Sequence, residues 1–451
     1  MSDAWLPDLA RAGVKYQAIA DALGAAIEQG GLRAGERLPP QRELAGKLGV
    51  DLTTITKAYD AVRGRGLIET RGRAGSYVRE PRPVEIADPA QVDAGMNMPP
   101  ELPALVHAIA GTVSALLLNG SSSRLQYQPA GGAAQDRAAG AALLRGLGLP
   151  AAQDRVLVTA GGQNALHAIL GAALQPGDAI ACGAFVYPGL RGAAERLGMR
   201  LVPLPEFDAD SLRRACREQA IRALYVVPSN DNPTTRTLSV EERQAIAAVA
   251  GEFGVQVIED DAYGALAANP IDPISSLVPD LGWYVASTSK ILSPALRVAF
   301  VHAPNVVAAL RLSADVHETA VMAPPLNVAM VARWIADGTY DRLLDGMRVD
   351  AAHRQAIAAE ALAGLDYDSH PQGYHLWLRL ADGIRPRDLA DLMRATGLSV
   401  TAAEQFAVGS GATQAVRVSL GGLAGHDQLR QGLRILHGYA TAPRLRPAAL
   451  I

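Results

Sequence analysis

A lysine within a run of small hydroxyl residues is the part of this chain best suited to chemistry. Lys290 ends the string Ser287-Thr288-Ser289-Lys290, and Arg297 follows seven positions later. A lysine amine that loses its proton can form a Schiff base with an aldehyde, and hydroxyls with a fixed guanidinium can hold a phosphate. The spacing is typical of a site for pyridoxal phosphate (PLP), with Lys290 as the Schiff-base residue. The phosphate would contact Ser287, Ser289 and Arg297. Because most lysines are solvated surface charges, this assignment depends on other residues.

Three other segments offer the remaining groups that such a cofactor needs. A carboxylate must keep the pyridine nitrogen protonated so that the ring withdraws electrons, and Asp260 is suited to that role. Tyr263 and Asn232 can hydrogen-bond the ring oxygen, and Tyr187 is a candidate for stacking on the ring. Each residue alone has a commoner explanation, since an Asp pair usually ends a strand, an Asn-Pro pair usually forms a turn, and a lone tyrosine is usually core.

A glycine pair marks a further phosphate site. The run 155–159 has the composition of a short strand, and a helix begins after it at Gly161-Gly162-Gln163. The free N–H groups at such a helix start suit an anion. We therefore expect Gly162 and Gln163 to contact the phosphate.

Alternating strands and helices from about residue 100 must position these groups. The strand candidates are the apolar runs 155–159, 179–181, 201–204, 223–227, 255–258 and 283–287. Three of these runs lead directly to Asn232, Asp260 and Lys290. The pattern predicts an α/β domain with a largely parallel sheet that binds its ligand at the carboxyl ends of the strands.

The first eighty residues follow a different pattern, that of a helix-turn-helix. Apolar spacing predicts a helix over 15–29. A second helix ends at Gly49, and a third begins after Asp51 and turns an apolar face inward. A short helix, a tight turn and a second helix form a DNA-binding motif whose last helix enters the major groove. The residues at the start of that helix, where contact with DNA is expected, are Thr53, Thr54, Thr56 and Lys57.

Basic residues gather in the same region. Two short apolar strands flank a turn that contains Arg71 and Arg73, which predicts a wing able to reach phosphates or a minor groove. Residues 40–79 hold eight Lys/Arg, among them Arg42, and four Asp/Glu, a balance of +4 in a chain whose net charge is −3. A basic patch in an otherwise acidic protein indicates one nucleic-acid-facing module. Charge alone fits a solvated helix face equally well.

Composition limits the class of protein and the compartment that we expect. Of 451 residues, 49% are hydrophobic and 19% charged, which is an ordinary globular balance. Cys182 and Cys216 have neither metal-ligand nor disulfide spacing, as in proteins of a reducing compartment. No secretory signal or membrane-length apolar run is present. We expect a cytoplasmic protein with no metal site and no membrane association. Three prolines within residues 81–89 predict a linker over 81–95, between domains at 1–80 and 96–440.

Residues 12–80 resemble the winged-helix domain of the GntR superfamily of bacterial regulators. The strings that carry the resemblance are Arg-Leu-Pro-Pro-Gln-Arg-Glu-Leu-Ala at 37–45 and Arg-Gly-Arg-Ala-Gly-Ser-Tyr-Val at 71–78. The resemblance implies that Arg42, Thr54 and the wing residues touch double-stranded DNA. Asp51-Leu52 stand where the usual pattern has Ser-Arg.

Residues 95–440 resemble the fold-type I aminotransferases of class I/II, because the Asn-Pro-Thr, Asp-x-x-Tyr and Ser-x-Ser-Lys elements occur in that family's order. The resemblance implies a PLP-dependent transferase fold with a mostly parallel central sheet and a smaller C-terminal α/β lobe. It implies the cofactor roles given above. It also implies that Tyr127 reaches the partner's phosphate in a homodimer, and that Arg417 grips an α-carboxylate. Thr235 and Ala295 stand where the family usually has glycine.

The two resemblances in this order are those of the MocR subfamily of regulators. They imply a dimeric transcription factor that binds PLP through Lys290 and senses a small amine, an amino acid or PLP itself, so that ligand binding shifts affinity for an operator. Two alternatives stay open. One is a working aminotransferase with an appended DNA-binding domain, and the other is a regulator whose large domain is only a dimerisation scaffold.

Overall fold

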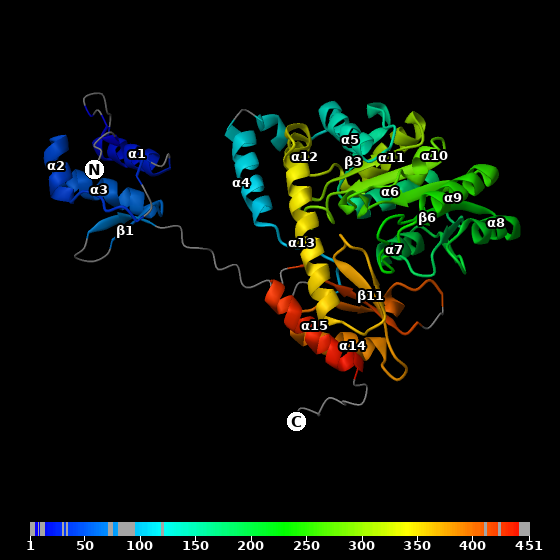
Figure 1. Ribbon diagram of the computed structural model, residues 1–451. Helices are drawn as coiled ribbons and strands as arrows, with labels where there is room; N and C mark the ends of the chain where they lie inside the picture. The colour runs from blue at the N-terminus through cyan, green and yellow to red at the C-terminus, as the bar shows by residue number, and fades with distance from the viewer. Residues whose placement is uncertain are drawn as a thin grey trace. The chain divides into compact units, whose positions relative to one another are not determined.

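The structure is a computed structural model, and it divides the chain into two compact units, Met1–Val92 and Asp93–Ile451. The described residues are 5–7, 9, 14–28, 31–32, 35–70, 75–79, 95–118, 121–409, 413–422 and 425–441. Each unit is described by itself below (Figure 1).

The smaller unit is a helix-turn-helix followed by a two-stranded ribbon. Its elements are α1 (Lys15–Glu28), α2 (Gln41–Leu48), α3 (Leu52–Gly64), β1 (Ile68–Thr70) and β2 (Ser76–Val78). Gly49 ends α2 in the left-handed conformation, with φ 62°, which glycine adopts without steric cost. Both α1 and α2 pack against α3, and Ile55 and Tyr59 of α3 are fully buried between them. β1 and β2 are antiparallel, as a wing requires.

The larger unit is built on a seven-stranded sheet in the order β3-β9-β8-β7-β6-β4-β5. The strands are β3 (Val156–Thr159), β4 (Ala179–Cys182), β5 (Arg200–Pro203), β6 (Ile221–Val226), β7 (Gln256–Asp260), β8 (Gly282–Ser287) and β9 (Ala299–His302). Only β9 runs against its neighbours, which makes the sheet largely parallel as predicted. Every residue of β8 is buried, because parallel sheets are covered on both faces.

Helices cover both faces of this sheet. The helices of this part of the chain are α4 (Pro103–Leu118), α5 (Ala134–Gly146), α6 (Gly162–Ala173), α7 (Pro188–Arg196), α8 (Ala209–Glu218), α9 (Val240–Phe253), α10 (Ile274–Leu277), α11 (Val306–Ala320) and α12 (Pro325–Asp337). Alternate residues of β4 belong to different hydrophobic clusters. Ile180 packs in a cluster that includes residues of α6 and α11, and Ala181 packs in another with residues of α8 and α9.

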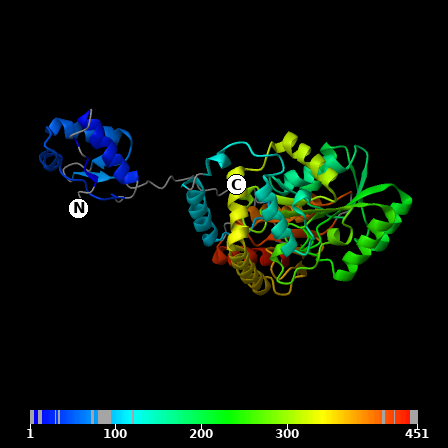
Figure 2. The ribbon, with the colours of Figure 1, turned by 90° about the horizontal axis from the view of Figure 1, so that it is seen from above.

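A smaller lobe follows in the chain and completes the predicted architecture. It contains a four-stranded antiparallel sheet, in the order β10 (Tyr367–Ser369), β11 (His375–Arg379), β13 (Ala415–Ser419) and β12 (Val400–Ala402). Its helices are α13 (Thr339–Ala361), α14 (Pro386–Met393) and α15 (His426–Thr441). The long α13 packs against α12 at the large sheet and α15 in the lobe, and α4 lies beside α12 and α13 in both views (Figures 1 and 2).

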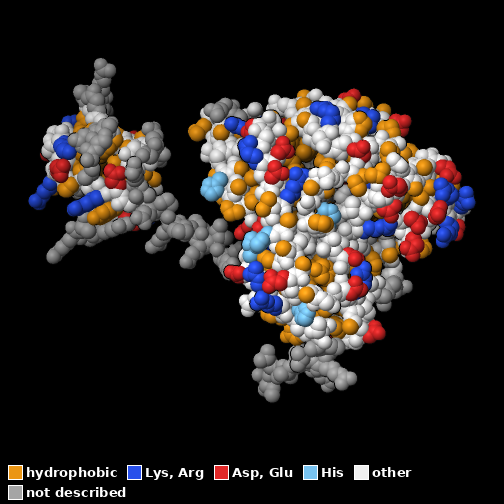
Figure 3. All heavy atoms as spheres, in the orientation of Figure 1, with side chains coloured by type: hydrophobic (Ala, Val, Ile, Leu, Met, Phe, Trp, Pro, Cys, Tyr) orange, Lys and Arg blue, Asp and Glu red, His pale blue; other side chains and the backbone are white. Residues whose placement is uncertain are grey.

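Short 3-10 helices fill several connections. They span Ser121–Leu125, Gln153–Arg155, Gly264–Leu266, Pro294–Leu296, Arg394–Thr396 and Ala403–Gln405. Basic and acidic side chains are interspersed over the face of the larger unit in Figure 3. Within the described residues, no helix combines the length and apolarity needed to cross a lipid bilayer.

Candidate functional site

Lys290 follows the carboxyl end of β8, where its amine faces the other predicted cofactor residues. Its Nζ donates a hydrogen bond to the carbonyl of Asn97 at 2.5 Å. Tyr374 donates its hydroxyl to the Lys290 carbonyl at 2.7 Å, which fixes the backbone. Burial, and then the Arg417 charge, lower the pKa of Lys290 to about 8, against an opposing effect of Asp260. About a tenth of the amine is therefore neutral and nucleophilic at pH 7, far more than for an ordinary lysine.

Asp260 ends the neighbouring strand β7, so the parallel register brings its carboxylate beside Lys290. Its Oδ2 accepts a hydrogen bond from the Tyr225 hydroxyl at 2.9 Å. Burial raises the pKa of Asp260 to about 6, and the Tyr225 bond opposes that rise. The carboxylate is thus placed to stabilise a protonated ring nitrogen. The sequence offered no signal for Tyr225, which stands within an apolar strand.

Two buried polar side chains join Asn97 to the site. Asn97 Nδ2 donates to the Tyr263 hydroxyl at 3.0 Å, and Ser419 donates its hydroxyl to Asn97 Oδ1 at 2.7 Å. Asn97 and Tyr263 are 2% and 3% exposed. Sequence reasoning assigned no role to Asn97, because its partners lie more than a hundred residues away in the chain.

Asn232 and Arg417 form the opposite side of the site. Arg417 on β13 donates from Nη1 to Asn232 Oδ1 at 3.0 Å and from Nη2 to the Gly95 carbonyl at 2.7 Å. Phe406 lies under the guanidinium, with its ring centroid 5.1 Å from Cζ. A buried guanidinium held in this way is well suited to a carboxylate.

The predicted phosphate residues also come together. Gly161, with φ 84°, precedes the first turn of α6, and a Cβ there would lie 2.6 Å from Arg297 Nη2. Ser287 Oγ accepts a bond from the Ser289 backbone N–H at 3.2 Å. The buried Ser289 Oγ, however, has no hydrogen-bond partner within the described part of the chain. Because buried hydroxyls are nearly always paired, this orphan beside a glycine-lined helix start fits a phosphate oxygen.

Tyr187 and Gln163 lie beside this helix start. Tyr187 precedes α7, and burial followed by the Asp260 charge raises its pKa. Gln163 Nε2 donates to the carbonyl of Gly189 at 3.1 Å. A Cβ on Gly189 would meet both the Tyr187 ring and Gln163 Oε1, so the glycine allows the two side chains to approach.

A cavity of about 890 Å³ is lined by some of these groups, but not by Asp260, Tyr263 or the predicted phosphate residues. Its lining includes Asn97, Tyr187, Asn232, Lys290 and Arg417. This volume lies within the usual range for small-molecule sites, roughly 300–1,000 Å³. Tyr127 does not line it and is 83% exposed.

In the smaller unit, the residues expected to touch DNA fall into three groups. Arg42, Thr53 and Lys57 are exposed, and Thr54 is half-buried. The Thr56 hydroxyl is already hydrogen-bonded within the unit, to Gln41 Oε1 at 2.9 Å and to the Leu52 carbonyl at 3.0 Å. Its hydroxyl therefore joins α2 to α3. Arg71 and Arg73 lie outside the described residues.

Each of the two units matches a known protein family. Residues 94–433 match the family "Aminotransferase class I and II", and residues 15–78 match "Bacterial regulatory proteins, gntR family". The HTH-type transcriptional regulator YdeF of Bacillus subtilis is 30% identical, over 96% of each chain. The vitamin B6 salvage pathway transcriptional repressor PtsJ of Salmonella typhimurium is 29% identical, over 89% of this chain and 93% of that one.

Solved aminotransferase structures share the fold of the larger unit. The α-aminoadipate aminotransferase LysN of Thermus thermophilus, solved with N-(5'-phosphopyridoxyl)-L-leucine, is 25% identical with a TM-score of 0.70, over 77% of this chain and 92% of that one. An archaeal alanine:glyoxylate aminotransferase shares the fold, with a TM-score of 0.71 over 77% of this chain and 90% of that one, at 21% identity.

Proposed function

Because this chain belongs to the MocR subfamily of GntR-type bacterial regulators, whose cofactor is PLP, we propose that ligand binding at the Lys290 site controls its affinity for DNA. The observation that carries the proposal is the set of contacts between this site and residues 95–97. Those residues come directly after the segment that joins the two units.

The cofactor roles that we propose follow from the geometry of the larger unit. When bound, PLP supplies an aldehyde that reacts reversibly with amines. Lys290 would provide the protein amine, and Asp260, which accepts a hydrogen bond from Tyr225, would hold a proton on the ring nitrogen. Asn232 and Tyr263 would bind the ring oxygen.

The remaining contacts hold the phosphate and the ring face. The Ser289 hydroxyl, which has no partner among the described residues, would contact a phosphate oxygen, and Tyr187 would stack on the ring. The other phosphate contacts that we propose are Gly162, Gln163, Ser287 and Arg297.

The effector that the site favours is a small amine that also bears a carboxylate. Its amine would meet the cofactor beside Lys290, and its carboxylate would pair with Arg417. A guanidinium that is 2% exposed and already fixed by Asn232 binds a carboxylate with little loss of side-chain freedom.

Effector binding would change the contacts of residues 95–97. An effector carboxylate would compete with the Gly95 carbonyl for Arg417 Nη2. An effector amine that replaced Lys290 on the cofactor aldehyde would free the lysine amine, which could again donate to the Asn97 carbonyl. The first change would weaken one anchor of this short segment, and the second would restore another. Binding thereby changes the start of the connection to the DNA-binding unit, which is the differential contact that any coupling requires.

DNA binding itself would use the exposed face of α2 and α3. Arg42, Thr53, Thr54 and Lys57 are placed for it, and Arg71 and Arg73 of the wing would add phosphate contacts. In a homodimer, with Tyr127 of one copy reaching the phosphate of the other, two winged helices would engage paired half-sites.

The deciding experiment combines visible absorbance with DNA binding. With PLP, the purified protein should show an absorbance band that shifts with one member of an amino acid panel, and the same amino acid should change affinity for a DNA fragment from upstream of its own gene. Lys290→Ala should lose the band and the response while it keeps its fold and basal DNA binding. An unchanged spectrum in this variant would refute the assignment of Lys290.

The same experiment separates regulation from catalysis. Asp260 and Arg417 stand where an aminotransferase needs them, so formation of a keto acid from the responding amino acid would indicate that the protein is also an enzyme. A response of DNA binding without keto acid would indicate a sensor alone.

A further inference from the structure

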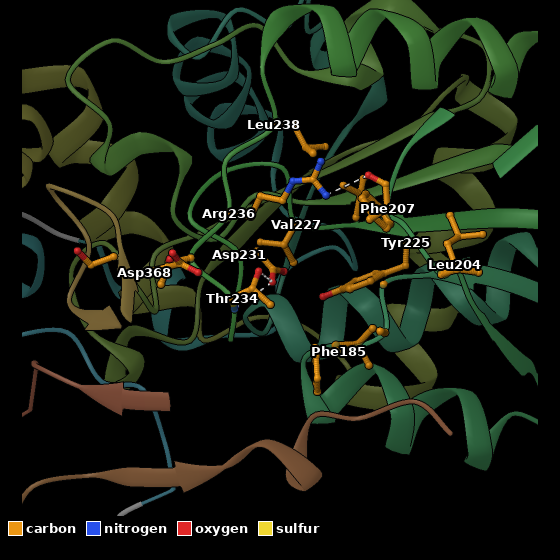
Figure 4. Close-up of a pocket in the computed structure, with 17 residues that line it drawn as sticks. Phe185, Leu204, Phe207, Tyr225, Val227, Asp231, Thr234, Arg236, Leu238 and Asp368 are labelled. Carbon is orange, nitrogen blue, oxygen red and sulfur yellow. Dashed lines mark hydrogen bonds between the residues drawn. The ribbon is translucent and has the colours of Figure 1, made fainter. Parts of the chain in front are cut away.

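A second cavity, of about 540 Å³, lies behind the cofactor site at the carboxyl ends of β4, β5 and β6. Its walls come from the loop after β4, the residues after β5, the end of β6, the loop 231–238 and β10 of the smaller lobe (Figure 4). None of its lining residues also lines the Lys290 cavity. Its volume is ample for a metabolite-sized ligand.

Residues of the second cavity are nevertheless bonded to, or next in the chain to, residues of the first site. Tyr225 lines the second cavity and donates its hydroxyl to Asp260 in the first site. Asp231 lines the second cavity, while the next residue, Asn232, lines the first and bonds to Arg417. A ligand in the second cavity would therefore contact elements that position the cofactor residues.

Apolar side chains form one part of this wall. Phe185, Leu204, Phe207, Val227 and Leu238 line the cavity, and Figure 4 shows Phe185 below the Tyr225 side chain and Leu204 to its right. This lining suits an aromatic ring or a branched aliphatic chain, since apolar surface contributes roughly 25 cal/mol per Å² buried.

The charged groups of the wall differ in how they are paired. Arg236 donates to the Phe207 carbonyl at 3.1 Å and to Glu242 at 2.5 Å. Asp368 is paired with Arg379. Both therefore already have fixed partners inside the protein.

Asp231 is the exception. Its Oδ2 accepts two bonds from Thr234, from the hydroxyl at 2.7 Å and the backbone N–H at 3.2 Å. Its Oδ1 accepts no hydrogen bond from the part of the chain that the structure describes. Burial raises the pKa of Asp231 to about 6, although the Thr234 hydrogen bonds and the Arg236 charge act to lower it. A cationic ligand would relieve that desolvation.

We propose that this cavity is a second small-molecule site, for an aromatic or branched aliphatic amine whose ammonium group pairs with Asp231. The amine nitrogen donates to Asp231 Oδ1, and the apolar part lies against Phe185, Leu204 and Phe207. The ligand needs no carboxylate, because the guanidinium of this wall is already paired. The site is thus distinct in chemistry from the one at Arg417.

Calorimetry on the full-length protein tests the proposal with phenethylamine and isopentylamine as probes. Pyridoxine 5'-phosphate should first saturate the cofactor site, because its alcohol cannot react with amines. At least one probe should bind once per chain. Asp231→Asn, which keeps an acceptor for Thr234 but removes the charge, should weaken binding about tenfold or more.

Two further variants complete the design. Leu204→Phe narrows the cavity without touching Asp231 and should also weaken binding. Asp368→Asn removes a lining charge that is already paired with Arg379, and it should bind as the unaltered protein does. Thermal unfolding confirms that each variant is folded. Failure of both amines to bind the unaltered protein would overturn the proposal. So would binding to Asp231→Asn and Leu204→Phe with the same affinity as to the unaltered protein.

Discussion

The reactivity of Lys290 depends on the side chains around it. Burial and the Arg417 charge lower its pKa to about 8, from an ordinary value of 10.5. The neutral amine is the nucleophile, and its fraction rises as pH rises through the pKa. The rate of PLP attachment, followed as growth of the visible absorbance band, should therefore rise with a midpoint near pH 8.

Removing the Arg417 charge should move that midpoint. Arg417→Met takes away a nearby cation, so the pKa of Lys290 rises and the midpoint shifts to higher pH. Arg348→Met, which removes a cation that contributes no shift to Lys290, is the control. An unchanged midpoint in Arg417→Met would contradict this electrostatic account.

Removing the Ser289 hydroxyl should mainly weaken PLP binding, whereas removing the neighbouring Thr288 hydroxyl should mainly lower the stability of the fold. Ser289 Oγ has no partner among the described residues, so Ser289→Ala should leave the free energy of unfolding within about 0.5 kcal/mol. It should weaken PLP binding about tenfold, because it removes a bond to a charged phosphate.

Thr288 provides the matched comparison. Its hydroxyl donates to the Val298 carbonyl at 2.8 Å in the core, so Thr288→Val should cost about 1 kcal/mol of stability and change PLP affinity less. Urea unfolding and fluorescence titration with PLP would measure both quantities. Equal PLP affinity in Ser289→Ala and the unaltered protein would refute the phosphate contact.

At the level of elements, the exposed start of α3 can be separated into residues that face solvent and residues that hold the motif together. Lys57 is exposed, so Lys57→Ala should weaken DNA binding and lower the slope of log affinity against log salt by about one. Thr56→Val should keep that slope but destabilise the smaller unit, because it breaks the bond to Gln41. The same salt slope in Lys57→Ala and the unaltered protein would exclude Lys57 from the phosphate contacts.

The loop after β6 shows how an element tolerates an unusual residue. Thr235, which stands where related aminotransferases usually have glycine, has φ 63°, a conformation that is uncommon for a β-branched residue. Its backbone N–H bonds to the Asp231 carbonyl at 2.7 Å. The tight turn that places Asn232 is therefore kept without the glycine.

For the whole molecule, the proposed coupling between effector and DNA runs through Arg417. Arg417→Gln keeps a donor for Asn232 but loses the charge that holds a carboxylate. We expect the variant to bind PLP and DNA, while the DNA response to the amino acid effector needs at least tenfold more ligand. Fluorescence anisotropy of labelled DNA, titrated with effector, measures this shift. An unaltered effector midpoint would show that Arg417 does not bind the effector.

The sequence by itself determined much of this protein. The order of Asn232, Asp260 and Lys290 after successive strands predicted the cofactor, the parallel sheet and the edge at which these residues meet, because parallel strands end together. Helical spacing and Gly49 predicted the helix-turn-helix. These features are local in sequence, so a pattern could reveal them.

Only the tertiary structure decided which other residues complete the site. Tyr225, Asn97 and Gly95 bond to residues from 35 to 322 positions away, and no local pattern marks such partners. The fold also bonded the Thr56 hydroxyl to Gln41 and placed Asp231 in the wall of a second cavity. Hydrogen-bond partners and cavities depend on how distant elements pack, and packing is a property of the folded chain rather than of any segment.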